Sequence, residues 1–295
     1  MLQNIRKIGL VLFLFNVLFS AFSIDYDEVF SPNCAAMLRD ERQLKFDLFL
    51  YQDFFSKNIE LLNDLNNSDH SFTEDMKERL SILVDEEFAD RVKKLEDRAF
   101  SLTDKGEKAF LLSLLNFDKY KIEFDIKKDK RSGQPFLEEA DSYIKDALRA
   151  NKKIAEFYSL HGEIQNQFII LKGGVSAIYY STEAKKSYQK ALRINKKDSN
   201  ALLLMGIWYI FAPDIAGGSV DKALSFIEKA RKYSTDEYEL FLTYVWESLA
   251  CSYSMKNTEA ITAVNQAISI APNNTWSNWI LEELNAGRRP LDAML

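Results

Sequence analysis

The chain contains 295 residues, of which 47% are hydrophobic and 28% are charged. These proportions are typical of a globular protein and exclude a disordered chain or one that crosses a membrane many times. Its 10 glycines and 5 prolines are few for this length, which favours long helices over the many tight turns of an all-β fold. The 38 Lys and Arg against 44 Asp and Glu give a net charge of −6, so we expect no nucleic acid as a partner.

The N-terminus resembles a secretory signal peptide over residues 1–23. Two basic residues precede an almost wholly apolar run over 8–22, and Ala21 and Ser23 place small residues at a cleavage site. The run is shorter than the roughly 20 residues that span a bilayer, although an uncleaved membrane anchor remains the alternative. The pattern predicts an exported, periplasmic or envelope-associated protein with no membrane span after cleavage.

Residues 24–104 have no repeat but are helical in pattern, with apolar stripes between 46 and 59 and between 80 and 95. We expect them to cap a larger helical stack as an N-terminal region. The only cysteines are Cys34 and Cys251. Export permits a bridge between them, but two buried thiols are the favoured reading because free cysteine is commonly a core residue.

A repeated pattern follows, in which alanine, an apolar or aromatic residue four positions later and alanine three after that occur four times. The first alanine recurs at steps of 44, 39 and 37 residues. This spacing puts the three side chains on one helical face, where the small residues allow a neighbouring helix to approach closely. The four triplets are Ala140, Ile144 and Ala147; Ala184, Tyr188 and Ala191; Ala223, Ile227 and Ala230; and Ala260, Val264 and Ala267.

Longer helices are expected between these signature helices, at about 153–171, 200–211 and 237–255, and residues 110–117 belong to the first arm of the earliest unit. Thr182, Ser219 and Thr258 are expected to begin signature helices as N-caps. Alternating helices at a period near 40 predict an all-α fold of stacked antiparallel helical hairpins over 105–285, followed by a tail over 286–295.

This pattern resembles the tetratricopeptide repeat (TPR), which has the same Ala, apolar and Ala positions in its second helix. Gly162 and Gly206 match the small residue of the first helix, Tyr209 matches its Tyr, and Pro272 matches the Pro of the turn. The first-helix Trp is absent, and the positions where Pro is usual hold Lys152, Lys196 and Thr235. The resemblance implies a right-handed superhelix that binds a protein partner, with no catalytic residues to carry over.

No residues stand in a pattern that indicates a catalytic, metal or cofactor site. The two histidines, His70 and His161, are far apart in sequence and lack a neighbouring ligand at helical spacing, so we expect no metal site. Gly173-Gly174 and Gly217-Gly218 lack the Gly-Lys-Ser/Thr of a phosphate-binding loop and are expected to supply positive φ at helix ends.

Aromatic residues provide the candidate partner groove. Most of them are spaced as core residues, but some are expected on first helices or inserted loops, facing the concave side of the stack. A groove lined with Tyr and Trp would bind a peptide, a helix or an apolar ligand. The candidates are Tyr179, Tyr180, Trp208, Phe211, Tyr244 and Trp246.

The segment 211–223, with a Pro and a Gly-Gly pair before a Lys-Ala helix, is the most individual in the chain. Together with the export signal and the helical layout, it resembles the exported TPR-containing T-components of tripartite ATP-independent periplasmic (TRAP) transporters of spirochaete type. That resemblance implies a periplasmic protein that forms homo-oligomers, carries a hydrophobic cavity or pore and docks a substrate-binding protein.

The sequence therefore leaves three hypotheses for the function. The leading hypothesis is an exported, non-enzymatic scaffold for a protein partner, as in a TRAP-type transporter. The second is a TPR adaptor in envelope assembly or secretion, unrelated to transport. The third is an enzyme on a helical scaffold, although the acidic residue in a cleft that a lytic enzyme requires has no recognisable motif here.

Overall fold

The computed structural model describes residues 29–44, 88–126, 129–235, 237–272 and 274–294. Within these ranges the chain forms helices, turns and bends and contains no strand. The all-α fold class that the sequence predicts is thus confirmed. The expected signal peptide over 1–23, His70 and the first apolar stripe lie outside the described residues.

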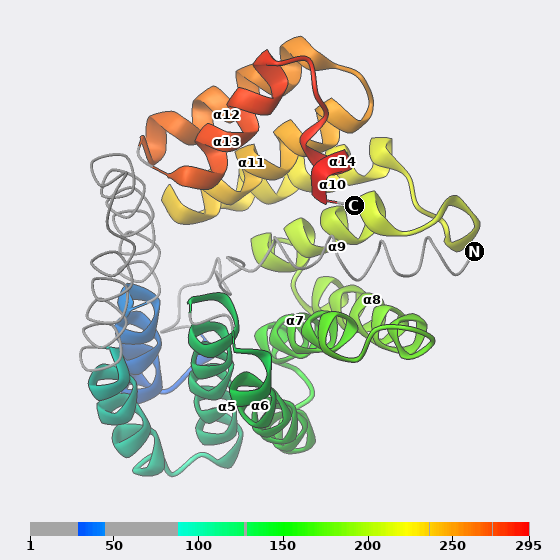
Figure 1. Ribbon diagram of the computed structural model, residues 1–295. Helices are drawn as coiled ribbons and strands as arrows, with labels where there is room; N and C mark the ends of the chain where they lie inside the picture. The colour runs from blue at the N-terminus through cyan, green and yellow to red at the C-terminus, as the bar shows by residue number, and fades with distance from the viewer. Residues whose placement is uncertain (1–28, 45–87, 127–128, 236, 273, 295) are drawn as a thin grey trace.

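Within the described chain, consecutive helices pair into four hairpins (Figure 1). The pairs are α5 (Lys105–Lys121) with α6 (Lys130–Ala150), α7 (Ala155–Lys172) with α8 (Ser176–Ile194), α9 (Ser199–Phe211) with α10 (Val220–Tyr233), and α11 (Glu237–Tyr253) with α12 (Asn257–Ile270). Each hairpin packs against the next, from α5–α6 in the lower part of Figure 1 to α11–α12 at the top. This is the stack of helical hairpins that the resemblance to the TPR implies.

Shorter elements complete the stack. α5 continues into a π-helical turn (Ile122–Ile126), and a 3-10 turn, η3 (Asp214–Ala216), lies between α9 and α10. α13 (Thr275–Asn285) packs on α12, and α14 (Pro290–Met294), within the segment that the sequence suggests as a tail, contacts α11.

The repeated alanines pack where the sequence pattern places them, on the second helix of each hairpin. Each triplet position is completely buried, with 0% exposure for the central residues Ile144, Tyr188, Ile227 and Val264. The eight alanines are equally buried: Ala140, Ala147, Ala184, Ala191, Ala223, Ala230, Ala260 and Ala267. At the third hairpin, a Cβ on Gly206 would stand 2.8 Å from Cγ1 of Ile227, so α9 and α10 meet at a distance that requires glycine.

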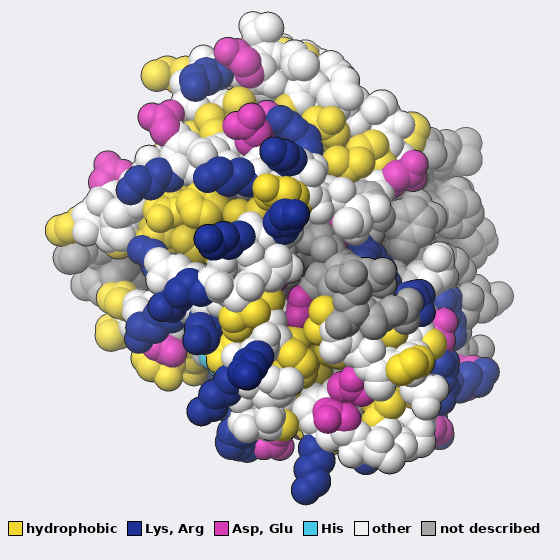
Figure 2. Space-filling view, turned by 180° about the vertical axis from the view of Figure 1, so that it is seen from behind, with side chains coloured by type: hydrophobic (Ala, Val, Ile, Leu, Met, Phe, Trp, Pro, Cys, Tyr) yellow, Lys and Arg dark blue, Asp and Glu magenta, His cyan; other side chains and the backbone are white. Residues whose placement is uncertain are grey.

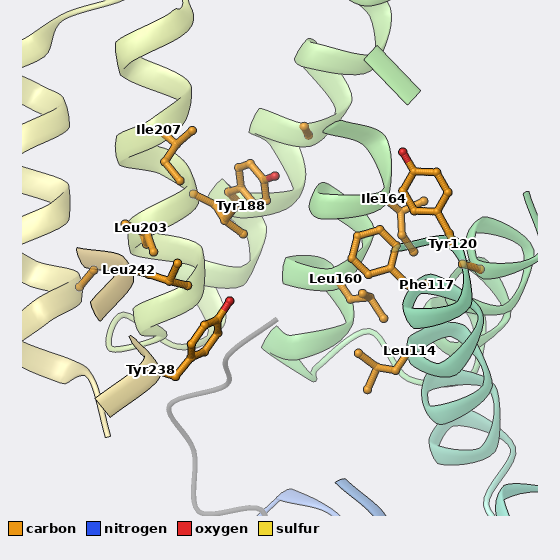
Figure 3. Packing of buried hydrophobic residues seen from close by; sticks show 14 of the residues in the cluster. Leu114, Phe117, Tyr120, Leu160, Ile164, Tyr188, Leu203, Ile207, Tyr238 and Leu242 are labelled. Carbon is orange, nitrogen blue, oxygen red and sulfur yellow. The ribbon is translucent and has the colours of Figure 1, made fainter. Parts of the chain in front are cut away.

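One apolar core runs through the hairpins (Figure 3). Phe117 of α5 and Ile164 of α7 belong to it, and it continues through Leu203 of α9 to Leu242 of α11. The first helices are buried on most of their surface, whereas the second helices bury little more than the stripe that contains the triplet. The exposed faces of the second helices therefore form much of the surface available to a partner.

Helix ends follow local hydrogen-bonding groups. Ser219 is the N-cap of α10, as predicted, and its Oγ accepts a hydrogen bond from the Lys222 amide at 3.4 Å. The N-cap predictions for Thr182 and Thr258 are wrong. Thr182 lies inside α8, where its hydroxyl donates to the Ile178 carbonyl, because no breaker separates it from the helix start at Ser176. Thr258 lies in the first turn of α12, one residue past the helix start.

Three of the four paired glycines supply positive φ near helix ends, as predicted, but the prediction is wrong for Gly218. Gly173, Gly174 and Gly217 have φ of 57°, 56° and 91°, which favour glycine. Gly218 has no positive φ; instead, a Cβ there would stand 1.8 Å from the Ala212 carbonyl oxygen. The missing side chain lets the turn after α9 close on itself.

Residues 29–44 lie across the N-terminal ends of the first helices. The Phe30 ring stacks on Phe110 of α5 at 5.5 Å and contacts Phe157 of α7 at 6.3 Å. Farther along, Arg42 forms an ion pair with Glu239 of α11 at 3.0 Å. This segment thus ties hairpins together that are distant in sequence. Cys34 within it and Cys251 in α11 are buried free thiols.

Candidate protein-binding face

The candidate tyrosines Tyr179 and Tyr180 lie on α8, a second helix, rather than on a first helix or a loop. Tyr180 stacks on Phe168 of α7, with ring centres 5.1 Å apart, and Tyr179 meets Tyr180 edge to face at 5.2 Å. Tyr179 is 61% exposed, so its ring is accessible to a partner. The two tyrosines therefore belong to the outer surface of the second hairpin.

Trp208 links two hairpins at the end of α9. Its indole Nε1 donates a hydrogen bond to Ser181 Oγ of α8 at 3.0 Å, and the side chain is only 9% exposed. The ammonium group of Lys185 lies 3.7 Å from the centre of the indole ring, which is close for a cation–π contact. Trp208 is thus both a packing residue and the floor beneath a surface lysine.

Phe211, Tyr244 and Trp246 lie at the next hairpin boundary. Trp246 is completely buried, where its ring meets Phe211 edge to face at 6.0 Å and Trp276 at 5.9 Å. The expectation that Trp246 lines a groove is therefore corrected: it is a core residue, because α11 is packed between α10 and α12. Tyr244 is half-buried, and the Arg231 guanidinium lies 5.1 Å from its ring centre.

Two further aromatic residues, Tyr209 and Phe226, join Trp208 in a surface that the sequence does not single out. Their rings stack 5.5 Å apart, and Tyr209 contacts Trp208 edge to face at 5.3 Å. We call these three rings and the lysines beside them the aromatic–lysine face. It consists of Lys185 from α8, Trp208 and Tyr209 from α9, and Lys222, Phe226 and Lys229 from α10.

Each lysine of the aromatic–lysine face lies near a ring. Lys222 is 5.5 Å from the centre of Tyr209, and Lys229 is 5.5 Å from the centre of Phe226. None of the three lysines forms an ion pair with a carboxylate of the described chain. Burial, and secondly the charge of Lys222, lowers the pKa of Lys185. In the left half of Figure 2, a band of hydrophobic side chains lies between Lys and Arg side chains.

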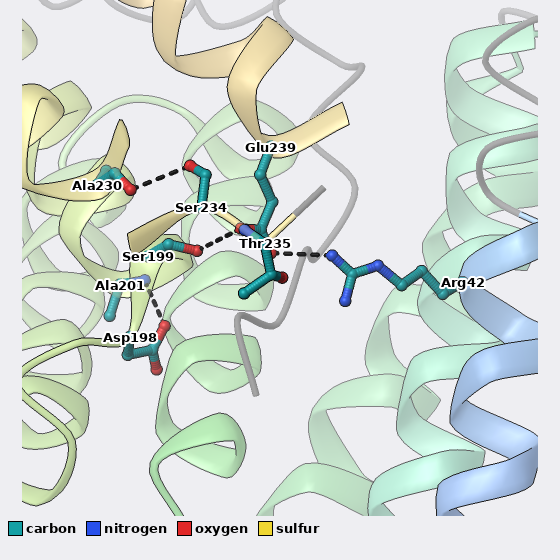
Figure 4. A network of polar contacts seen from close by, with 8 residues as sticks. All are labelled: Arg42, Asp198, Ser199, Ala201, Ala230, Ser234, Thr235 and Glu239. Atoms are coloured by element: carbon teal, nitrogen blue, oxygen red, sulfur yellow. Dashed lines mark hydrogen bonds and ion pairs between the residues drawn. The ribbon is translucent and has the colours of Figure 1, made fainter. Parts of the chain in front are cut away.

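A second polar region lies at the N-terminal ends of the first helices (Figure 4). The carboxylate of Glu239 accepts hydrogen bonds from Ser199 Oγ at 2.9 Å and from the Thr235 amide at 2.8 Å, in addition to its ion pair with Arg42. Its side chain is only 3% exposed. Because each carboxylate oxygen of Glu239 is engaged, this network holds the helices together.

Two buried carboxyl groups lie near that network. Asp198 caps α9, and its other oxygen accepts from Ser159 Oγ at 2.7 Å. Burial raises the pKa of Asp198, and burial together with the charge of Asp198 raises the pKa of Glu156 to about 8. Glu156 is thus largely protonated at neutral pH, and folding stability falls as pH rises between about 4.5 and 8.

His161 lies close to a hydroxyl, a contact that sequence spacing does not show. Its Nδ1 is 2.7 Å from Ser187 Oγ, a distance compatible with a nucleophile and its base. However, Ser187 is 6% exposed and lies within α8, where the helix uses the backbone amides that an oxyanion site needs. Burial lowers the pKa of His161, so the contact joins α7 to α8 with a neutral ring.

No group of three or more His, Cys, Asp or Glu side chains in the described chain has an arrangement that fits a metal ion. Among the helices of the described segments, none is both long enough and apolar enough to cross a membrane.

Comparison with known proteins gives distant similarities. No protein-family profile and no curated protein matches the sequence. Among solved structures, the chain is similar to YrrB, a TPR protein with an unusual peptide-binding site. The two sequences are 13% identical, the match covers 76% of this chain and 97% of that chain, and the TM-score is 0.36. It is also similar to the APC/C hetero-tetramer Cut9–Hcn1, with 13% identity, 90% of this chain and 59% of that chain covered, and a TM-score of 0.34. Similarities this distant carry no inference about partners.

Proposed function

We propose that this chain is a non-enzymatic scaffold that binds a partner protein on the aromatic–lysine face. The observation that carries the proposal is the alternation of rings and ammonium groups across α8, α9 and α10. Aromatic side chains contribute strongly to protein interfaces, and charges beside them guide association and orientation. The stacked hairpins support this face, because the buried alanine triplets anchor α8 and α10 and Gly206 of α9 packs closely against Ile227 of α10.

The finer proposal is that the scaffold is exported and acts in a TRAP-type solute transporter, with a periplasmic substrate-binding protein as its partner. It is supported by the signal-like N-terminus and by the segment 211–223, whose Ile215 is 95% exposed. Val175 and Ile178, at the start of α8, are also exposed at 80% and 63%. Apolar side chains of this kind extend the surface that a protein partner would cover.

Affinity capture from the envelope fraction of the source cells tests both the scaffold role and the transporter role. The tagged full chain should co-purify with a substrate-binding protein, and its intact mass should show removal of residues 1–23. Phe226→Ala should reduce recovery of the partner at least tenfold while leaving the thermal melting temperature within a few degrees. Tyr253→Ala is the matched control, because Tyr253 is an exposed α11 ring with Arg289 at 6.0 Å and lies outside the face.

The outcomes separate the hypotheses. Recovery of outer-membrane assembly factors without a substrate-binding protein would contradict the transporter role and favour the adaptor in envelope assembly. Retention of residues 1–23 would mean a membrane anchor. Equal recovery with Phe226→Ala and with the unchanged chain would contradict the use of this face.

A further inference from the structure

The aromatic–lysine face has an order that constrains what can bind it. The Lys185 ammonium lies 5.9 Å from the Tyr209 ring centre. The Tyr209 ring centre is 5.5 Å from the Phe226 ring centre, which in turn is 5.5 Å from the Lys229 ammonium. Lys222 lies beside the middle of this path, 5.5 Å from Tyr209. These distances set an upper limit on the span of the path, which corresponds to at most about five residues of an extended chain at about 3.3 Å per residue.

The rings in this path form a floor rather than a set of projections. Tyr209 and Phe226 are half-buried and Trp208 is nearly covered, so a ligand would lie over them instead of receiving them into its own cavity. The ammonium groups of Lys222 and Lys229 belong to exposed residues on the same helix. A ligand that fits would therefore present apolar groups to the floor and negative charges to the lysines.

The local charge is opposite to that of the whole chain. Residues 176–235 contain ten Lys or Arg and five Asp or Glu, whereas the chain has a net charge of −6. One of those acidic residues, Glu183, pairs with Lys186 at 2.7 Å, and another, Asp198, is buried. Lys185 and Lys222 also repel each other, which a carboxylate between them would offset.

We infer that the aromatic–lysine face binds an acidic protein segment of up to about five residues in an extended conformation, with apolar side chains between its carboxylates. This inference rests on the proposed function and specifies the partner of the same face. An acidic segment is favoured over a nucleic acid because only three lysines line the path and the rest of the chain is acidic. It is favoured over a bilayer because the rings do not project far enough to insert.

Fluorescence anisotropy with the full chain tests the inference. The probe is a labelled six-residue peptide that alternates glutamate and leucine, compared at low salt with its glutamine–leucine counterpart. We expect the glutamate peptide to bind at least tenfold more tightly, and Lys185→Gln and Lys222→Gln each to weaken its binding at least threefold. Lys196→Gln is the matched control, because Lys196 is an exposed lysine in the turn after α8 and belongs to no ring contact of the face.

Equal binding of the two peptides, or loss of affinity in Lys196→Gln as large as in Lys222→Gln, would overturn the inference. Tighter, lysine-dependent binding to a twelve-nucleotide oligothymidine or to phosphatidylglycerol vesicles would also overturn it. These results are distinguishable from failure of the proposed function, because capture of a partner protein that depends on Phe226 and not on the lysines would leave that proposal standing.

Discussion

Gly162 of α7 lies directly against the ring of Tyr188 of α8, so closely that a Cβ on Gly162 would stand 2.2 Å from Cε1 of that ring. Tyr188 is completely buried, and its hydroxyl accepts a hydrogen bond from Asn166 Nδ2 at 2.8 Å. The ring therefore has little freedom to move away. The second hairpin is built around this contact between the smallest residue of one helix and the central residue of the other helix's alanine triplet.

Gly162→Ala should destabilise the protein for this reason. Helix propensity alone predicts a gain of about 1 kcal/mol for alanine over glycine inside a helix. Overpacking against Tyr188, which typically costs about 1–3 kcal/mol, should outweigh it and leave a net loss of up to about 2 kcal/mol in the free energy of unfolding, measured by urea titration. The loss should be smaller when the same change is made beside Tyr188→Leu, which removes the ring. A Gly162→Ala protein as stable as the unchanged chain would contradict the contact.

Ala230→Leu tests the third hairpin in the same way. Ala230 has no exposed surface, so the larger side chain must displace α9 or its neighbours, and we expect a loss of about 1–3 kcal/mol in the free energy of unfolding. Glu228→Leu provides the control, since Glu228 is exposed on the same helix and its replacement should change stability by less than about 0.5 kcal/mol. Similar melting curves for the two variants would remove the packing role of the triplet.

Much of the fold follows from such local rules. The alanine triplets locate all four second helices because small residues at spacings of four and three leave few other arrangements for close-packed helices. Ser219 caps its helix as expected, whereas Thr182 does not, since the residues before it are also able to form helix. The contact of Arg42 with Glu239 joins residues far apart in sequence, and no local pattern indicates it.

Sequence patterns predict less of the candidate site than of the fold. Trp246 and Tyr179 are both aromatic residues in helices, yet one is fully buried and the other is 61% exposed. The difference arises from which helices pack around each, and that is a property of the stack rather than of the residue. Tyr209 and Phe226 acquire their significance only because α9 and α10 bring them together between lysines. In the sequence, the one signal for this face is the excess of Lys and Arg over Asp and Glu in residues 176–235.

Folding stability should depend on pH through Glu156. Its pKa is raised from the ordinary 4.5 to about 8, so between these values the folded protein holds a proton that the unfolded chain releases. Stability should therefore fall as pH rises through this window, by about 1.4 kcal/mol per pH unit for one proton. Asp198, whose pKa is also raised, acts in the same direction.

Glu156→Gln removes the titrating group and keeps the shape of the side chain. Urea unfolding between pH 6 and pH 8 should show the variant gaining stability relative to the unchanged chain as pH increases. Parallel pH profiles for the two proteins would mean that Glu156 is already ionised in the folded state, contrary to its burial beside Asp198.

If the partner docks on the aromatic–lysine face, site-specific photo-crosslinking in the source cells should trap it there. A photoreactive phenylalanine derivative would replace Phe226 in one version of the chain and Tyr253 in another. We expect a crosslinked partner protein from position 226 and none, or far less, from position 253. A partner crosslinked from position 253 and absent from position 226 would contradict docking on this face.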